Sequence, residues 1–262
     1  MNDEFTKTAL PLDSTGLQTA LDRLGVTAAQ FWAVLHVETS GCGFDVDRRP
    51  AILYERHIFS RLTNRRFDAS HPDISNGQPG GYGAAGARQY ERLKAAIQLD
   101  RLAALQSASW GIGQVMGFNA QKIGYADVEQ MVLAICASEA FQVLAMADFI
   151  KSEKLDGPLR SSDWARFAAG YNGSNYRINN YDTRLASAHD ALARGTLPDL
   201  DVRTGQLILT FLHFDPQGVD GVMGKLTRSA MNAYQQRQGL EMTDFFDEAT
   251  LNALGQSLAA LP

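Results

Sequence analysis

The chain has 262 residues, which is enough for one large domain or two smaller ones. Hydrophobic residues make up 45% of it and charged residues 20%, a balance typical of soluble globular proteins with an apolar core. The net charge of −5 argues against a general nucleic-acid-binding protein, which would carry a basic surface.

The N-terminal region indicates where synthesis starts and predicts a first helix. Met1–Phe5 is acidic and polar and lacks the basic and then apolar pattern of a secretory signal. Synthesis in a cytoplasm, without a signal peptide, is therefore expected. Apolar residues then repeat at helical spacing up to Gly25, which predicts a short helix over residues 14–25.

Glu38 is the most informative residue of the next predicted helix, which runs from residue 28 towards residue 41 with Thr27 as its cap. Phe31, Leu35 and Glu38 share one helical face because they are spaced by four and then three. The apolar face and the last-turn position should both raise the pKa of Glu38. A carboxyl group that keeps its proton near neutral pH can act as a general acid, although most glutamates at helix ends are simply solvated.

A strand and a long loop follow. Residues 51–54 form a short strand candidate, and a helical turn or two is expected after it. The segment 64–86 is rich in Pro and Gly and is predicted to be a loop. Its Gly81–Gly86 stretch has the glycine spacing of a dinucleotide-binding fingerprint. Pro79 precedes that stretch in place of a strand, so we reject nucleotide binding.

The middle of the chain predicts long helices. Residues 88–105 have a clear helical repeat, and residues 131–151 are almost wholly apolar, which predicts a central buried helix or a pair of helices. Glu139 and Asp148 interrupt the apolar run, so no membrane span is expected. A glycine-bearing segment at 107–117 lies between the two helical regions.

A predicted turn at Tyr171-Asn172-Gly173 separates two further helices. Ser162 or Asp163 can cap the first, which runs through residue 169. The second is expected at 185–192.

A domain boundary is expected near residues 194–199, where Gly195, Pro198 and two aspartates interrupt the helical pattern. We therefore predict a first domain at 1–196 and a second at 199–262. The second should contain three short helices, near 202–214, 225–238 and 247–259. It also contains a weak internal repeat, Asp220 to Thr227 and Thr243 to Thr250, in which a turn leads into a helix.

The cysteines and histidines predict neither a disulfide framework nor a metal site. The two cysteines, Cys42 and Cys136, are too few for the first and too far apart for the second. Both are expected to be buried, reduced and structural. The five histidines show no zinc spacing, so we expect no metal and no cofactor.

Four segments resemble, in order and spacing, those of lysozyme-like muramidases and lytic transglycosylases. Glu38–Gly41 resembles the catalytic Glu-Ser helix end, Ile52–Phe59 the Phe-Glu-x-His-x-Phe signature of the phage N-acetylmuramidase domain, Ser109–Gly117 the Ser-x-Gly-Leu-x-Gln loop, and Phe167–Gly173 the Ala-x-x-Tyr-Asn-x-Gly turn. The resemblance spans roughly residues 20 to 193. It implies a mainly α fold, in which a lysozyme-like two-lobed helical catalytic domain with a small β-hairpin is followed by a small three-helix bundle.

The tail resembles a small peptidoglycan-binding domain that begins Asp-Gly-x-x-Gly-x-x-Thr. Asp220, Gly221, Gly224 and Thr227 match that motif. The second half departs from the family, because Phe245-Phe246-Asp247 stands where a Gly usually precedes Asp. The whole chain resembles a modular phage endolysin with its catalytic domain first.

The resemblance implies that Glu38 protonates the glycosidic oxygen of the β-1,4 bond between N-acetylmuramic acid and N-acetylglucosamine, for lysis of the host cell. A hydrolase also needs a second carboxylate. Glu55 is the preferred candidate because it lies in the signature strand. Asp45 and Asp47 are alternatives that could instead pair with the neighbouring arginines 48 and 49.

Four further residues are implied as substrate contacts. Gln114 would offer its amide to the sugars or position a water, while Tyr171 and Asn172 would line the cleft. Trp110 and Tyr171 have faces suited to sugar stacking. The alternatives are core packing for the two aromatic residues and internal loop hydrogen bonds for Gln114 and Asn172.

Three other functions are compared with this one. A lytic transglycosylase would give 1,6-anhydro ends and need no second carboxylate. A non-catalytic wall-binding phage structural protein would not need the acid at all. An amidase or endopeptidase would require a zinc set or a Cys/His pair, and neither is found.

The resemblance implies bacterial peptidoglycan as the partner, with no nucleic acid and no membrane, and we expect a monomer. The protein would act on the periplasmic wall after release from the host cytoplasm. Removing the residues after Pro198 is expected to leave activity on soluble fragments while weakening retention on whole walls.

Overall fold

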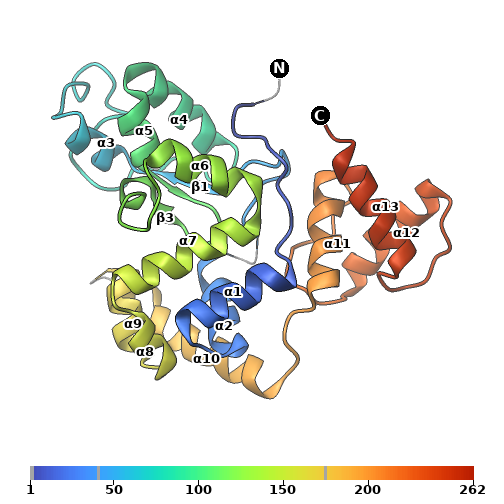
Figure 1. The fold of residues 1–262 in the computed structure, drawn as a ribbon. Helices are drawn as coiled ribbons and strands as arrows, with labels where there is room; N and C mark the ends of the chain where they lie inside the picture. Colours follow the sequence, from blue (N-terminus) through green and yellow to red (C-terminus); the bar gives the residue numbers. More distant parts are fainter. Residues whose placement is uncertain (1–2, 40–41, 174–175) are drawn as a thin grey trace.

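A computed structural model describes residues 3–39, 42–173 and 176–262, without the side chains of Glu38 and Thr39. The chain is mainly helical with a small sheet, which confirms the predicted class. Figure 1 shows two groups of elements, with the last three helices set beside the N-terminal segment. None of the helices in these ranges is long and apolar enough to span a bilayer.

The first group contains most of the helices. They are α1 (Ser14–Leu24), α2 (Ala28–Thr39), α3 (Arg56–Leu62), α4 (Arg88–Leu99), α5 (Arg101–Gln106), α6 (Val128–Ala137), α7 (Glu139–Ser152), α8 (Asp156–Arg160), α9 (Trp164–Tyr171) and α10 (Tyr181–Arg194), with the short 3-10 turns η1 (Gly117–Asn119) and η2 (Tyr176–Asn179). The second group contains α11 (Leu200–Phe211), α12 (Lys225–Gln238) and α13 (Glu248–Ala259).

Polar caps divide the predicted long helices. Asp100 is extended and its carboxylate accepts a hydrogen bond from the Ala103 N–H at 3.0 Å, so the helix expected over 88–105 is two helices, α4 and α5. Ser138 caps α7 in the same way through the Phe141 N–H. The apolar run 131–151 is therefore a pair of helices, one of the two forms predicted.

The sheet consists of β1 (Ile52–Tyr54), β2 (Ala108–Trp110) and β3 (Val115–Met116) in that order, all antiparallel. Ile52, Tyr54, Trp110 and Val115 are buried on one face. Because side chains alternate along a strand, Leu53, Ser109 and Met116, which are paired in register, lie on the opposite face. The β2–β3 hairpin is the element around which the site is built.

Two hydrophobic clusters hold the chain together. The larger lies among α1–α10 and the sheet. The smaller lies among α11–α13, but it also takes in Ala9 and Phe44 from the first group. The rings of Phe44 and Phe211 meet edge to face, with centroids 6.3 Å apart. The second group is therefore packed against the first. The exact boundary at 196–199 stays a prediction.

Candidate active site

Helix α2 carries Glu38 in its last turn. The helix begins with a capping box, because the Thr27 hydroxyl accepts from the Gln30 N–H at 3.3 Å and the Gln30 amide oxygen accepts from the Thr27 N–H at 3.0 Å. Phe31 and Leu35 on the predicted face are buried. The Glu38 side chain and the next motif residues, 40 and 41, lie outside the described residues.

Arg184 of α10 binds the end of this helix. Its guanidinium donates to the carbonyl of Val37, the residue before Glu38, at 3.2 Å. A cation at a helix C-terminus offsets the partial negative charge of the last carbonyls. The sequence analysis missed Arg184, because no local pattern links residues 147 positions apart.

The segment that follows α2 lies against the hairpin. A Cβ added to Gly43 would stand 1.9 Å from the Gln142 Oε1 and 3.2 Å from the Ile112 Cβ, so a side chain at this position would displace the Gln142 amide. The same Gln142 oxygen accepts from the Ile112 N–H at 2.8 Å. The Gly43 carbonyl also accepts from the Ala51 N–H at 2.8 Å. The chain beyond the Glu38 helix is thus fixed between the hairpin and α7.

Gln114 organises the hairpin itself. It adopts a left-handed backbone conformation with φ of 46°. Its amide nitrogen donates to the carbonyls of Gly111 and Ala51 at 2.9 and 3.2 Å. Its amide oxygen accepts from the Ser109 hydroxyl at 2.8 Å. These bonds are the internal loop hydrogen bonds that the sequence analysis kept as an alternative to substrate contact. In this structure Gln114 is therefore a positioning residue.

Tyr171 joins the third motif to the hairpin. Its hydroxyl donates to the Gly113 carbonyl at 2.7 Å. Its half-buried ring stacks on Phe167 with centroids 5.3 Å apart and meets the edge of Phe149 at 5.6 Å. The neighbouring Asn172 ends α9 and is half-buried. The Tyr-Asn turn therefore lies at the tip of the glutamine hairpin.

The structure corrects the sugar-stacking role predicted for Trp110. Its side chain is 0% exposed, lies 5.6 Å from the Phe5 ring, and donates its indole N–H to the Leu105 carbonyl at 3.0 Å. A fully buried ring cannot stack on a sugar, so core packing is its role. An aromatic ring that is exposed beside the hairpin is Phe118, 41% exposed on η1 directly after β3. The sequence analysis did not single it out.

Glu55 lies at the start of α3 and makes no capping hydrogen bond there. Its side chain is 15% exposed, and its Oε2 is 3.1 Å from the His57 Nδ1. Burial raises the pKa of Glu55, while His57 and the hydroxyl of Tyr82 act in the opposite direction. A half-buried carboxyl of this kind is typical of functional sites as well as of structural ion pairs.

Asp45 and Asp47 are engaged with Arg49. The Arg49 guanidinium lies 2.7 Å from the Asp45 carboxylate and 2.8 Å from that of Asp47. Asp45 also accepts from the backbone N–H groups of Asp47 and Arg49. Both aspartates thus adopt the pairing role that the sequence analysis kept as their alternative, with Arg49 as the partner.

A buried ion pair connects the two groups of helices next to this site. The Arg203 guanidinium of α11 lies 2.6 Å from the Glu139 carboxylate of α7, and the two side chains are 1% and 0% exposed. Glu139 also accepts from the backbone N–H groups of Leu12 and Gly43. Arg203 lies 5.8 Å from the Trp32 ring of α2. The second group of helices thereby contacts both the Glu38 helix and the segment after it.

Neither cysteine forms a disulfide. Burial raises the pKa of the Cys42 thiol to about 12, and the Glu139 carboxylate adds to this effect. Burial likewise raises the pKa of the Cys136 thiol to about 12. Both therefore stay protonated, as a structural role requires. Cys136 is buried as expected, and Cys42 is half-buried.

Gln206 of α11 holds the matched residues of the tail motif together. Its amide oxygen accepts from the N–H groups of Asp220 and Gly221 at 3.0 and 2.8 Å. Its amide nitrogen donates to the Asp220 carboxylate and to the Thr227 hydroxyl at 2.8 and 3.0 Å. Thr227 is buried, and Gly224 precedes α12. The motif thus builds the turn, with the Thr227 hydroxyl facing inward.

The internal repeat has a structural counterpart. In the second half the buried Gln235 donates to the Thr250 hydroxyl at 2.9 Å, as Gln206 does to Thr227 in the first half. Each glutamine thus fixes the turn before the following helix. The departure from the family motif at residues 245–247 leaves this arrangement in place.

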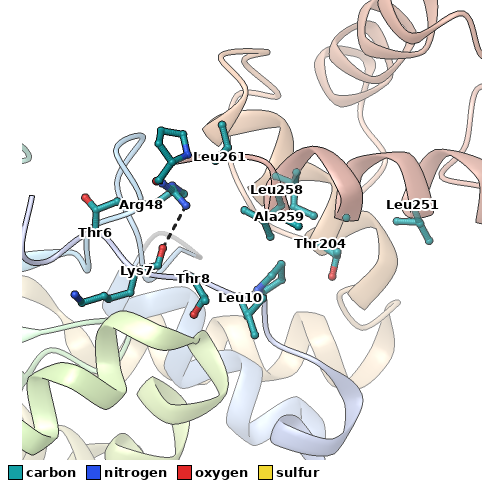
Figure 2. A pocket seen from close by; sticks show the side chains of 14 residues that line it. Thr6, Lys7, Thr8, Leu10, Arg48, Thr204, Leu251, Leu258, Ala259 and Leu261 are labelled. Carbon is teal, nitrogen blue, oxygen red and sulfur yellow. Dashed lines mark hydrogen bonds between the residues drawn. The ribbon is translucent and has the colours of Figure 1, made fainter. Parts of the chain in front are cut away.

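A cavity of about 650 Å³ lies between the N-terminal segment and the helices α11 and α13 (Figure 2). Leu10, Leu258 and Leu261 form part of its lining, together with Lys7 and Arg48. None of its described lining residues is acidic, so it offers no proton donor for acid catalysis. No group of three or more His, Cys, Asp or Glu residues in the described ranges is arranged to hold a metal ion.

Three segments far apart in sequence thus meet around one hairpin, and the fold and this site define a lysozyme-like catalytic domain followed by a small helical module. Residues 27–193 match the family model described as N-acetylmuramidase, and residues 198–254 match that of a peptidoglycan binding domain. The chain belongs to the N-acetylmuramidase family.

Among solved structures, the chain is similar to the crystal structure of Burkholderia AP3 phage endolysin. The two share 42% sequence identity over 73% of this chain and 72% of that one, with a TM-score of 0.65. A search of curated proteins finds no significant match. These findings confirm the lysozyme-like fold and identify a modular endolysin that degrades peptidoglycan.

Proposed function

We propose that the enzyme cleaves the β-1,4 bond between N-acetylmuramic acid and N-acetylglucosamine, with Glu38 as the proton donor to the glycosidic oxygen. The observation that carries the proposal is the convergence on the β2–β3 hairpin. Strand β1 pairs with it, Gly43 packs against it, and Tyr171 bonds to its tip. The segments that flank Glu38 in the family motifs are therefore assembled on one element.

In this proposal the other residues have distinct tasks. Gln114 holds the hairpin in shape, and Tyr171 and Asn172 line the sugar-binding cleft beside it. Phe118 offers an exposed ring for sugar stacking, a role proposed earlier for Trp110. Glu55 is the second carboxylate, since Asp45 and Asp47 are paired with Arg49. The second domain, 199–262, retains the enzyme on the wall.

Mass spectrometry of digested sacculi tests this function. A muramidase should release fragments with reducing N-acetylmuramic acid ends. Fragments with 1,6-anhydro ends would instead identify a lytic transglycosylase, which uses the 6-hydroxyl of the substrate in place of water. Cleaved peptides with intact glycan, or no cleavage, would contradict glycosidase activity altogether.

Replacing Glu55 by glutamine tests its role as the second carboxylate. A base or nucleophile must be ionised, and burial raises the pKa of Glu55. Wild-type activity should therefore rise with pH as this group loses its proton. Glu55→Gln should reduce the rate by about 10²-fold or more and abolish that rise. Initial rates on sacculi across the acidic range measure both effects.

The stability of the wild type should fall as pH rises, in the opposite direction to its activity. The folded state holds the Glu55 proton more tightly than the unfolded chain, so the wild type loses stability as pH rises through the folded pKa. Glu55→Gln lacks this loss and should be at least as stable at neutral pH. Glu91→Gln, an exposed glutamate on α4, is the control. A Glu55→Gln enzyme with an unchanged pH–rate profile would rule out the assignment.

A further inference from the structure

The segment Arg56–Arg66 is strongly basic in an otherwise acidic protein. It covers α3 and the start of the following loop, and it contains no Asp or Glu. The whole chain has a net charge of −5. Its basic residues are Arg56, His57, Arg61, Arg65 and Arg66. Positive charge is therefore concentrated at one edge of the catalytic domain, where Figure 1 shows α3 and its loop.

This segment forms one wall of a pocket of about 490 Å³. Its lining residues are His57, Ser60, Arg61, Asn64, Arg65 and Gly77. Gly77 belongs to the glycine-rich loop that the sequence analysis left without a function. A Cβ on Gly77 would lie 3.8 Å from the nearest nitrogen of Arg65, so that guanidinium lies over the loop backbone.

The two arginines in the pocket are not held in ion pairs, although the Asp68 carboxylate, whose pKa the Ser75 hydroxyl lowers, lies near enough for Arg65 to lower that pKa as well. Within the ranges that the structure describes, Arg61 and Arg65 form neither an ion pair nor a side-chain hydrogen bond. The nearby Asp68 is occupied by the hydroxyl groups of Ser60 and Ser75 at 3.0 and 2.5 Å. Arg66, by contrast, pairs with a carboxylate outside the pocket, that of Asp100, at 3.3 Å.

The pocket adjoins the proposed active site from two directions. His57 in its lining contacts Glu55, with 3.1 Å between the Nδ1 and the Oε2. Arg61 lies 5.7 Å from the centre of the exposed Phe118 ring, directly after the hairpin. A glycan bound along the hairpin would therefore present its substituents to these two guanidinium groups.

We propose that this pocket binds a carboxylate of the muramyl-peptide unit of peptidoglycan, so that the enzyme favours anionic, substituted glycan over a neutral sugar chain. The inference rests on the proposed function. Each muramic acid carries either a free lactyl carboxylate or a short peptide with carboxylates of its own. Guanidinium groups that form no ion pair within the protein match such carboxylates in charge and planar geometry.

The double variant Arg61→Gln/Arg65→Gln tests this inference, with Arg66→Gln as the matched control. Each enzyme is assayed on peptide-bearing glycan, on the same glycan with its carboxyl groups converted to amides, and on glycan stripped of peptides, which has free lactyl carboxylates. For the wild type, amidation should raise KM about fivefold, the scale of two partly exposed ion pairs. The double variant should already show this raised KM on unmodified peptide-bearing glycan, and amidation should not raise its KM further.

The value of kcat should stay close to that of the wild type, because His57 is left in place and the substituted residues, Arg61 and Arg65, have no role in the proposed chemical step. If the double variant loses affinity for peptide-bearing glycan alone, the ligand is a stem-peptide carboxylate. If it loses affinity for stripped glycan alone, the ligand is the free lactyl carboxylate, and if it loses affinity for both, the pocket accepts either carboxylate. A double variant as sensitive to amidation as the wild type overturns the inference. A wild type that releases no glycan fragments would instead refute the proposed function.

Discussion

Glu38→Gln is expected to fold normally and to lose wall lysis, with a fall in rate of about 10³-fold, the scale of general acid catalysis. Glutamine has nearly the same shape as glutamic acid but has no acidic proton to give to the leaving oxygen. The fold should be preserved because α2 is held by Phe31 and Leu35 in the core and by Arg184 at its end. Turbidity loss of purified sacculi and thermal unfolding measure the two expectations.

The control for this experiment is an exposed carboxylate elsewhere. Glu129→Gln makes the same substitution in a surface pair with Arg101 and should leave lysis unchanged. Near-wild-type clearing by Glu38→Gln would refute the catalytic assignment. Lost clearing together with a lower melting temperature would indicate a structural role for Glu38 instead.

Arg203→Leu is expected to reduce the free energy of unfolding by about 3–5 kcal/mol, because it leaves the buried Glu139 carboxylate without its cation. The two backbone donors of Leu12 and Gly43 remain, but they do not neutralise the charge. Urea denaturation measures the change. Since that carboxylate also holds Gly43, lysis should weaken at temperatures where the variant is still folded.

A double-mutant cycle separates the pair from simple loss of packing. Adding Glu139→Gln to Arg203→Leu removes the buried charge, so the double variant should be more stable than Arg203→Leu alone. Arg101→Leu, which breaks two exposed pairs, with Glu4 and with Glu129, should change stability by less than about 1 kcal/mol. Additive effects of the two buried substitutions would show that the ion pair has no special role.

The same contact changes the expectation for truncation after Pro198. That experiment assumed two independent modules. Truncation removes Arg203 and Phe211, which uncovers the Glu139 carboxylate and the Phe44 ring at the base of the active-site segment. The truncated enzyme is therefore expected to be less stable and less active even on soluble fragments.

Local features of the fold could be predicted from the sequence. The cap at Thr27, the end of α1 at Gly25, and the loop that carries Gly81–Gly86 all agree with the structure. Each depends on residues within a few positions, so backbone preferences and short-range hydrogen bonds decide it. The break of the 88–105 helix at Asp100 was missed, because apolar spacing continues across the capping residue.

Side-chain roles were less predictable than motif positions. Trp110 and Gln114 stand at their expected places in the motif, yet one lies in the core and the other closes the hairpin. Residue type shows that a side chain can stack or donate. Whether it does so towards substrate depends on what surrounds it, which the motif alone does not contain.

The sequence by itself determined the helical class and the order of the motifs, and it singled out Glu38 as the acid that we propose, since these follow from local spacing and from the family resemblance. Only the tertiary structure decided how the site is held. Three hydrogen-bonded pairs hold it: Val37 with Arg184, 147 residues apart, Gly113 with Tyr171, 58 apart, and Glu139 with Arg203, 64 apart. No local preference encodes such partners, because only packing of the whole chain brings them together.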